Sequence, residues 1–142
     1  MKISAKTDYA CRALLQLALH WPSVDPLSIG SIANIQQIPM KFLPHILLQL
    51  KQLGYVDSIR GKSGGYVLEK PPAEIRLSDV MRAFSEPMCM FPAVGNKRGK
   101  NNCLISIWKE IDEVTRKQMD SLNFEEISRR ERNLKTVPTF EI

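Results

Sequence analysis

The chain has 142 residues, 44% hydrophobic and 25% charged, a length and composition that predict one globular domain with a modest core. Its 20 basic and 15 acidic side chains leave a formal charge of +5, which suits nucleic acid and equally suits an ordinary solvated surface. The longest apolar run, at 13–21, is too short to span a bilayer, and no signal peptide is recognisable, so a cytoplasmic protein with no membrane partner is expected. Three cysteines in that compartment disfavour a disulfide framework and favour core packing, a metal site or redox chemistry.

Three helices are predicted in the first part of the chain. Apolar residues recur at three- and four-residue spacing over 7–20, with Asp8 in the first turn, where a negative charge is favourable. A second helix is expected after Ser28, a residue type that is common at N-caps. A third helix is expected over 39–54, with Pro39 in its first turn.

The rest of the chain predicts a hairpin followed by further helices. Alternating residues at 55–60 and 66–70 indicate two strands, joined by a glycine-rich turn. A short helix is expected over 77–86, a long one over 104–122, and a second short one from Asn123, which fits a capping box with Glu126. Apolar residues in the long helix are spaced close to 3.5 residues apart, as in a helix that packs against a partner helix. The candidate dimer interface consists of Leu104, Ile107, Trp108, Ile111 and Val114.

Three helices followed by a hairpin form the element order of a winged helix-turn-helix. In that architecture the third helix enters the major groove of DNA and its first residues reach base edges, while the hairpin forms the wing. Arg60 and Lys62 supply positive charge for phosphates or the minor groove, and Ser28 and Ser31 are placed to donate to phosphates. The candidate DNA-binding residues are Ser28, Ser31, Pro39, Met40, Lys41, Phe42, His45, Arg60, Gly61, Lys62, Ser63, Gly64 and Gly65.

Each of these features also has a plainer explanation. Phe42 shares a helix face with Ile46 and Leu50, so it suits the core as well as a DNA contact, and a single exposed His45 is commonly just a satisfied polar residue. An enzyme is disfavoured, because two histidines without a nucleophile or phosphate-binding motif leave little for a catalytic site. A protein-interaction module would explain the long apolar helix but not the basic hairpin.

Several segments resemble the Rrf family of bacterial winged helix-turn-helix transcription regulators, from Met1 to about Ile127. The most specific is the match to L-x-x-I-L-x-x-L-x-x-x-G-x-V-x-S-x-R-G-x-x-G-G-Y-x-L between Leu43 and Leu68, and MKISAKTDYACRALLQLA and LSDVMRAFSEP also match. The resemblance implies a mainly α fold with a small β-hairpin wing and a long C-terminal dimerisation helix. It also implies a homodimer that binds a near-palindromic operator in double-stranded DNA. On this pattern the chain divides into a DNA-binding domain (1–86), a cysteine-bearing loop (87–103), dimerisation helices (104–132) and a tail (133–142).

Many members of this family hold an iron–sulfur cluster with three cysteines in that loop. Cys89 and Cys103 match the outer two, the middle one is absent, and a histidine used by some members is Ser106 here. In other members an aspartate matching Asp8 completes the cluster across the dimer, and Cys11 lies near the same helix face. The resemblance therefore implies a site made by Cys89 and Cys103 of one subunit with Asp8 of the other, and the helical spacing adds Cys11 as a further candidate ligand beside Asp8. This mixed ligand set suits a 2Fe–2S cluster.

Alternatives to a cluster stay open at this point. Cys11 lies within an apolar helix and also suits a core thiol. Cys89 and Cys103 could instead form a reversible disulfide and act as a thiol switch. A regulator of this kind could also respond to a protein partner, with no redox role for its cysteines.

Overall fold

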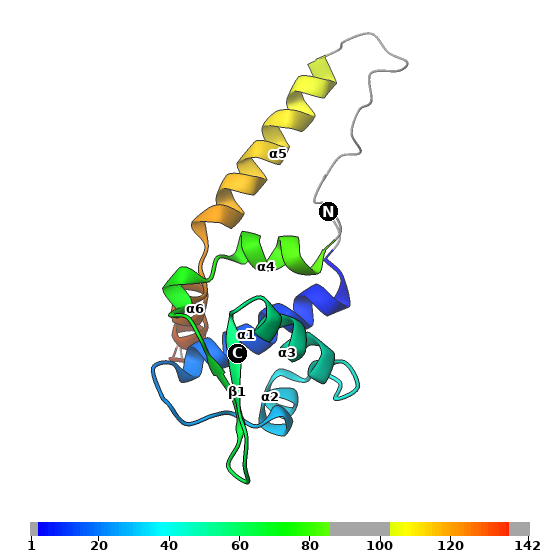
Figure 1. The fold of residues 1–142 in the computed structure, drawn as a ribbon. Coiled ribbons are helices and arrows are strands. Elements are labelled where there is room, and N and C mark those ends of the chain that lie inside the picture. Colours follow the sequence, from blue (N-terminus) through cyan, green and yellow to red (C-terminus); the bar gives the residue numbers. More distant parts are fainter. Residues whose placement is uncertain (1–2, 86–102, 137–142) are drawn as a thin grey trace, which may run out of the picture.

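A computed structural model describes residues 3–85 and 103–136 of the chain. It has six α-helices, one short 3-10 helix and a two-stranded antiparallel hairpin, which confirms the predicted winged helix-turn-helix (Figure 1). The elements are α1 (Ala5–His20), α2 (Ile29–Gln36), α3 (Leu43–Gln52), β1 (Val56–Ile59), β2 (Gly65–Leu68), η1 (Pro72–Glu74), α4 (Leu77–Phe84), α5 (Cys103–Ser121) and α6 (Phe124–Thr136).

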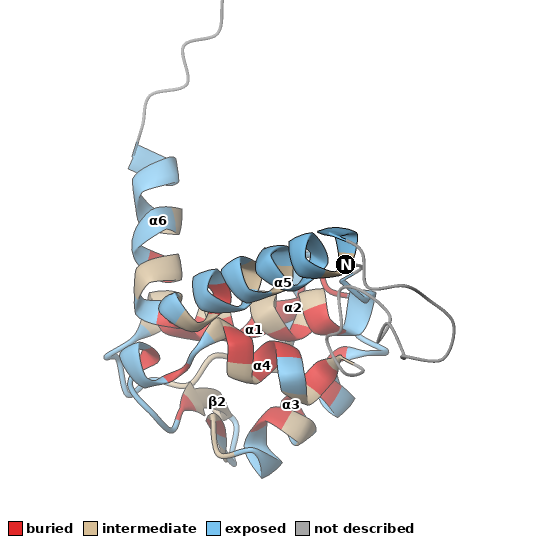
Figure 2. Cartoon of the chain, turned by 90° about the horizontal axis from the view of Figure 1, so that it is seen from above, coloured by how far each residue is buried: buried red, intermediate tan, exposed pale blue. Residues whose placement is uncertain are grey.

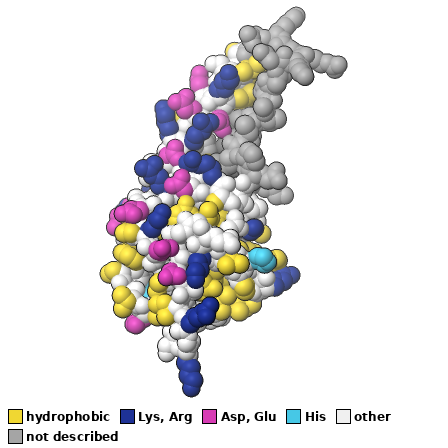
Figure 3. Space-filling model, viewed as in Figure 1, with side chains coloured by type: hydrophobic (Ala, Val, Ile, Leu, Met, Phe, Trp, Pro, Cys, Tyr) yellow, Lys and Arg dark blue, Asp and Glu magenta, His cyan; other side chains and the backbone are white. Residues whose placement is uncertain are grey.

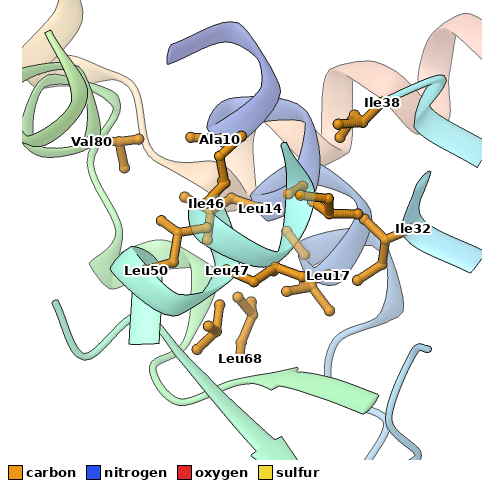
Figure 4. Packing of buried hydrophobic residues seen from close by; sticks show 14 of the residues in the cluster. Ala10, Leu14, Leu17, Ile32, Ile38, Ile46, Leu47, Leu50, Leu68 and Val80 are labelled. Carbon is orange, nitrogen blue, oxygen red and sulfur yellow. The ribbon is translucent and has the colours of Figure 1, made fainter. Parts of the chain in front are cut away.

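The core is built around α1, whose small and branched apolar side chains form one continuous buried face. Leu14 and Leu17 are fully buried or nearly so, and Figure 4 shows them facing Ile46 and Leu47 of α3. The hairpin adds Leu68 to the same cluster, and α4 adds residues from its own inner face. Burying one aliphatic side chain of this size contributes roughly 1.5–3 kcal/mol, so this cluster is what holds α3 on the body.

The third helix begins later than predicted. It starts at Leu43, because Gln37 in a left-handed conformation (φ 54°) ends α2 and the N–H of Ile38 then bonds to Ala33 O at 2.9 Å. Pro44, rather than Pro39, occupies the first turn, where a missing N–H has no cost. The segment 39–42 is therefore the turn that leads into α3.

Two other helix ends also differ from the prediction. Helix α1 begins at Ala5, since the Ser4 hydroxyl oxygen accepts a hydrogen bond from the Thr7 N–H at 3.1 Å. Helix α6 starts after Asn123, whose side chain accepts from the Glu126 N–H at 2.9 Å, as the sequence predicts. It then continues to Thr136, four residues into the segment expected to form a tail.

The hairpin is held against the segment that precedes α2. Its strands pair in the register Val56↔Leu68 to Ile59↔Gly65. Beyond that pairing, Leu27 exchanges two backbone hydrogen bonds with Tyr66, of 3.0 and 2.8 Å. The wing is thus joined to the start of the helix-turn-helix by main-chain contacts.

Helix α5 projects from the body in Figure 1, and Figure 2 shows it exposed along most of its length. Only near its end does it become buried, at Met119. Across residues 3–85 and 103–136, no helix combines the length and the apolarity that crossing a bilayer would require.

Candidate nucleic-acid interface and cysteine site

The turn that leads into α3 presents exposed side chains and is fixed to α1 by an aromatic contact. The ring of Phe42 lies 5.8 Å from the ring of Tyr9 with an angle of 27° between the planes, and Lys41 Nζ lies 4.8 Å from the Phe42 ring. Phe42 is 43% exposed, so it is not a core residue. Pro39, Met40 and the first-turn residue His45 are also exposed.

The two serines at the start of α2 form a local pair. Ser28 caps the helix as predicted, since its Oγ accepts from the Ser31 N–H at 3.1 Å and donates to Ser31 Oγ at 3.0 Å. Both residues are exposed at a helix N-terminus, where backbone N–H groups and the helix dipole favour a negatively charged phosphate.

The tip of the hairpin is exposed and basic. Arg60 and Lys62 stand in the exposed loop between β1 and β2, and Figure 3 shows Lys and Arg side chains down to the projecting hairpin. Gly61 has φ +123°, and a Cβ at Gly64 would lie 2.3 Å from the backbone oxygen of Ile59. These glycines are therefore needed by the hairpin itself, whatever it touches.

The wing and α3 are also tied to each other. Lys51 Nζ, near the end of α3, donates to Ser58 Oγ at 2.5 Å and lies 3.5 Å from Asp57 Oδ1, both on β1. This pair is largely exposed and contributes little stability.

A cavity of about 530 Å³ lies between α1, α4 and α5. Asp8 and Cys11 both line it, so the structure brings together the two first-helix residues predicted as metal ligands. Its other lining residues are Ile3, Leu77, Met81, Val114, Thr115, Gln118 and Met119.

A chain of contacts leads from Asp8 to the end of α2 and to the turn before α3. The Asp8 carboxylate is ion-paired with Arg12, whose Nε donates to Asp8 Oδ2 at 2.9 Å and whose Nη1 donates to Gln36 O at 2.8 Å. Gln36 is the last residue of α2. The Arg12 guanidinium also lies 5.2 Å from the ring of Tyr9, which stacks on Phe42. Arg12 was not among the predicted site residues, although its i,i+4 spacing from Asp8 is the usual spacing of a helical ion pair.

Cys11 is partly buried against the core, which fits the core-thiol interpretation. Burial, and secondarily the Asp8 charge, raises the pKa of its thiol to about 12. A thiol with that pKa is protonated at neutral pH and is a poor nucleophile. Cys11 would become a ligand only where a bound metal displaces that proton.

Cys103 is exposed and is the first residue of α5, while Cys89 lies outside the described residues. Cys103 precedes Val114, which lines the cavity, by eleven residues. At 1.5 Å per residue that separation is roughly 16 Å along the helix. Cys103 therefore lies too far along α5 to reach Asp8 and Cys11 of its own chain. Among the residues that the structure describes, no three His, Cys, Asp or Glu side chains are grouped to hold a metal ion.

A buried hydroxyl attaches the base of the cysteine-bearing loop to α1. Thr7 is fully buried, and its Oγ1 donates to Phe84 O at 3.2 Å and lies 3.1 Å from Ser85 Oγ. Phe84 and Ser85 end α4, immediately before residues 86–102. These hydrogen bonds hold the end of α4 against Thr7, the residue before Asp8, a contact that sequence spacing did not reveal.

The candidate dimer interface forms an exposed apolar face of α5. Ile111 is 39% exposed and Val114 68%, unusual values for such side chains on the longest of the described helices. All five predicted interface residues are exposed in the single chain, and they are Leu104, Ile107, Trp108, Ile111 and Val114.

Comparisons with known proteins agree with this geometry. The model of the Rrf2 family, described as iron-dependent transcriptional regulators, matches residues 3–130. The Synechocystis sp. protein slr0846, which carries the name HTH-type transcriptional regulator, is 32% identical over 129 residues, 89% of this chain and 87% of its own. IscR of Photorhabdus laumondii is 29% identical over 130 residues, 89% and 79% of the two chains. The solved structure of CymR, the global cysteine regulator of B. subtilis, superposes with a TM-score of 0.82 at 27% identity, covering 92% of this chain and 98% of CymR.

Proposed function

The chain belongs to the Rrf2 family of DNA-binding transcription regulators, and we propose that it senses redox or iron–sulfur status through its first helix. Members of this family are regulators rather than enzymes. The proposal keeps the predicted division into a DNA-binding domain (1–86), a cysteine-bearing loop (87–103), dimerisation helices (104–132) and a final segment (133–142).

The proposed DNA contacts are α3 in the major groove, the wing on a phosphate or minor-groove edge, and the serines of α2 on phosphates. The exposed basic tip at Arg60 and Lys62 and the exposed turn before α3 support this docking. The exposed apolar face of α5 supports a homodimer, because an apolar stripe of that kind is stabilised by a second copy of itself. A two-fold symmetric dimer presents two α3 helices to a near-palindromic operator.

The residues present fit a 2Fe–2S cluster shared between subunits. Asp8 and Cys11 line one cavity, whereas Cys103 in the same chain stands roughly 16 Å along α5 from that cavity, so a shared site would draw its ligands from both subunits. Cys89 and Cys103 of one subunit would hold the cluster with the partner subunit's Asp8 and the partner subunit's Cys11. Thiolates and a carboxylate are suitable ligands for iron, and the bound cluster would supply a centre that gains or loses one electron.

The observation that carries this proposal is the contact chain from Asp8 to α2 and α3. Arg12 and a cluster iron would compete for the same Asp8 carboxylate. When Arg12 loses that partner, its bond to Gln36 O and its position over Tyr9 lose their support. Those contacts hold the end of α2 and, through Phe42, the start of α3. A ligand at Asp8 would thereby change the placement of the DNA-reading elements.

The test is the absorption spectrum of protein prepared without oxygen, together with its iron and sulfide content. Cys89→Ser and Cys103→Ser should each abolish the visible chromophore, and Asp8→Ala should weaken it or make it labile in air. Cys11→Ser separates the two interpretations of that thiol, because a core thiol leaves the colour unchanged and a ligand does not. Iron-free wild-type protein, together with a Cys89→Ser variant that binds DNA normally under oxidising and reducing conditions, would contradict the proposal.

A thiol switch without iron is the second candidate, favoured by the exposure of Cys103 at the start of α5. Oxidation would remove two electrons and two protons from Cys89 and Cys103 and form one S–S bond, with a peroxide or disulfide as the acceptor. In that case DNA affinity would follow the oxidation state of iron-free protein. A response to a protein partner would instead leave DNA affinity unchanged by either treatment.

A further inference from the structure

The outward face of α3 is unexpectedly apolar for a surface that reads DNA. The buried side chains of α3 lie on one side of the helix, and the helical period places Pro44, His45 and Leu48 on the other side, with Gln52 one turn beyond Leu48. All four of these residues are exposed. Leu48 is 50% exposed, although the two residues before it, Ile46 and Leu47, are buried. Packing within the chain does not explain why leucine stands at that position.

Basic residues stand on the elements that flank this face. Lys41 lies in the turn before α3 and the wing adds Arg60 and Lys62, whereas Lys51 in the last turn of α3 is ion-paired with Asp57 of β1. The partner that fits an apolar strip within a basic rim carries both negative charge and small apolar groups. The major groove of DNA has both, because the phosphates border it and the 5-methyl groups of thymine project into it.

We propose that Leu48 and Pro44 read thymine methyl groups in each operator half-site. The proposal rests on the docking of α3 in the major groove described above, and it goes beyond the predicted contacts, which did not include either residue. His45 stands beside them and can donate or accept one hydrogen bond at a base edge. The exposed side chains in the middle of α3 therefore recognise an operator mainly through contacts with thymine methyl groups, and less through paired hydrogen bonds to one base.

The experiment uses a duplex selected from a random-sequence library by the full-length wild-type protein, prepared in the state that binds DNA. Each thymine of one half-site is replaced in turn by uracil, which removes only the methyl group, and affinity is measured by fluorescence anisotropy. Losing one buried methyl group should weaken binding about fourfold at one or two thymines. Leu48→Ala should bind the thymine and uracil duplexes equally at the thymine that Leu48 contacts, and Pro44→Ala should do so at the thymine that Pro44 contacts. Leu53→Ala, a leucine at the end of α3 that is 40% exposed, is the matched control and should keep the fourfold difference.

Two results would overturn this inference while leaving the docking of α3 intact. One is normal, salt-dependent affinity for every uracil duplex. The other is a methyl dependence that persists in Leu48→Ala and in Pro44→Ala. Failure of the library to yield any preferred duplex would instead remove the docking of α3 on which the inference rests, and the inference with it.

Discussion

Replacing Gly65 with alanine should detach the wing from the segment that precedes α2. A Cβ at this position would lie 2.2 Å from Leu27 O and 2.8 Å from Ser28 N, both of them backbone atoms that side-chain motion cannot relieve. The strand or the segment must move, and either movement breaks the two hydrogen bonds between Leu27 and Tyr66.

These contacts set the loss of unfolding free energy in Gly65→Ala. Two backbone hydrogen bonds contribute about 1 kcal/mol each, and overpacking adds about 1–3 kcal/mol, so Gly65→Ala should lose roughly 3–5 kcal/mol of unfolding free energy. Urea denaturation followed by circular dichroism measures this loss. Variants should be compared at one protein concentration, because the apparent stability of a dimer depends on concentration.

Gly30 provides the matched control. It lies exposed in α2, and a Cβ there would meet nothing within 4 Å. Gly30→Ala should therefore gain about 0.5–1 kcal/mol from higher helix propensity. Equal urea midpoints for Gly65→Ala and the wild type would refute the close approach of β2 to Leu27.

Three further predictions concern assembly, DNA binding and pH. Ile111→Asp should place a charge in the α5 interface at a cost of several kcal/mol, and light scattering should then report monomer or aggregate, whereas an unchanged dimer would place the interface elsewhere. Arg60→Ala should weaken operator binding by roughly 1–3 kcal/mol, whereas Lys62→Ala should weaken all sequences alike and reduce the salt dependence; unchanged titrations for both would contradict the wing contact. Hydrogen bonds from Arg129 and its neighbour hold the pKa of Glu126 at about 2, below its ordinary 4.5. The contribution of Glu126 to stability is full above pH 4.5 and is lost as the pH falls toward 2. Because Arg129 lowers the pKa of Glu126, an NMR titration should show that this pKa rises in Arg129→Gln, and an unchanged pKa would refute the pairing.

Local patterns in the sequence were sufficient to predict the winged helix-turn-helix. Apolar spacing located the helices, and Ser28 and Asn123 cap α2 and α6 as predicted. The predicted start of α3 was wrong because two prolines, Pro39 and Pro44, both suit a first helical turn. Gln37 decides between them, because its left-handed backbone conformation ends α2 before Pro39. A glutamine does not require that conformation, so the sequence did not predict it.

The candidate site was less predictable because it depends on contacts between distant residues. Arg12 reaches Gln36 and Tyr9 reaches Phe42 only after α1, α2 and α3 have packed together. Asp8 and Cys11 were predictable as neighbours, since they are three residues apart on one helix. Leu48 was overlooked because apolar spacing alone does not distinguish a core leucine from an exposed one on a ten-residue helix.

The most direct test of cluster-dependent regulation is the affinity of one preparation for one selected duplex, measured without oxygen before and after removal of iron. If cluster binding at Asp8 changes the support of α2 and α3, the two dissociation constants should differ about tenfold or more, a coupling typical of two linked sites. Equal dissociation constants, in a sample whose chromophore and iron have both been lost, would contradict the proposal that this regulator senses a cluster.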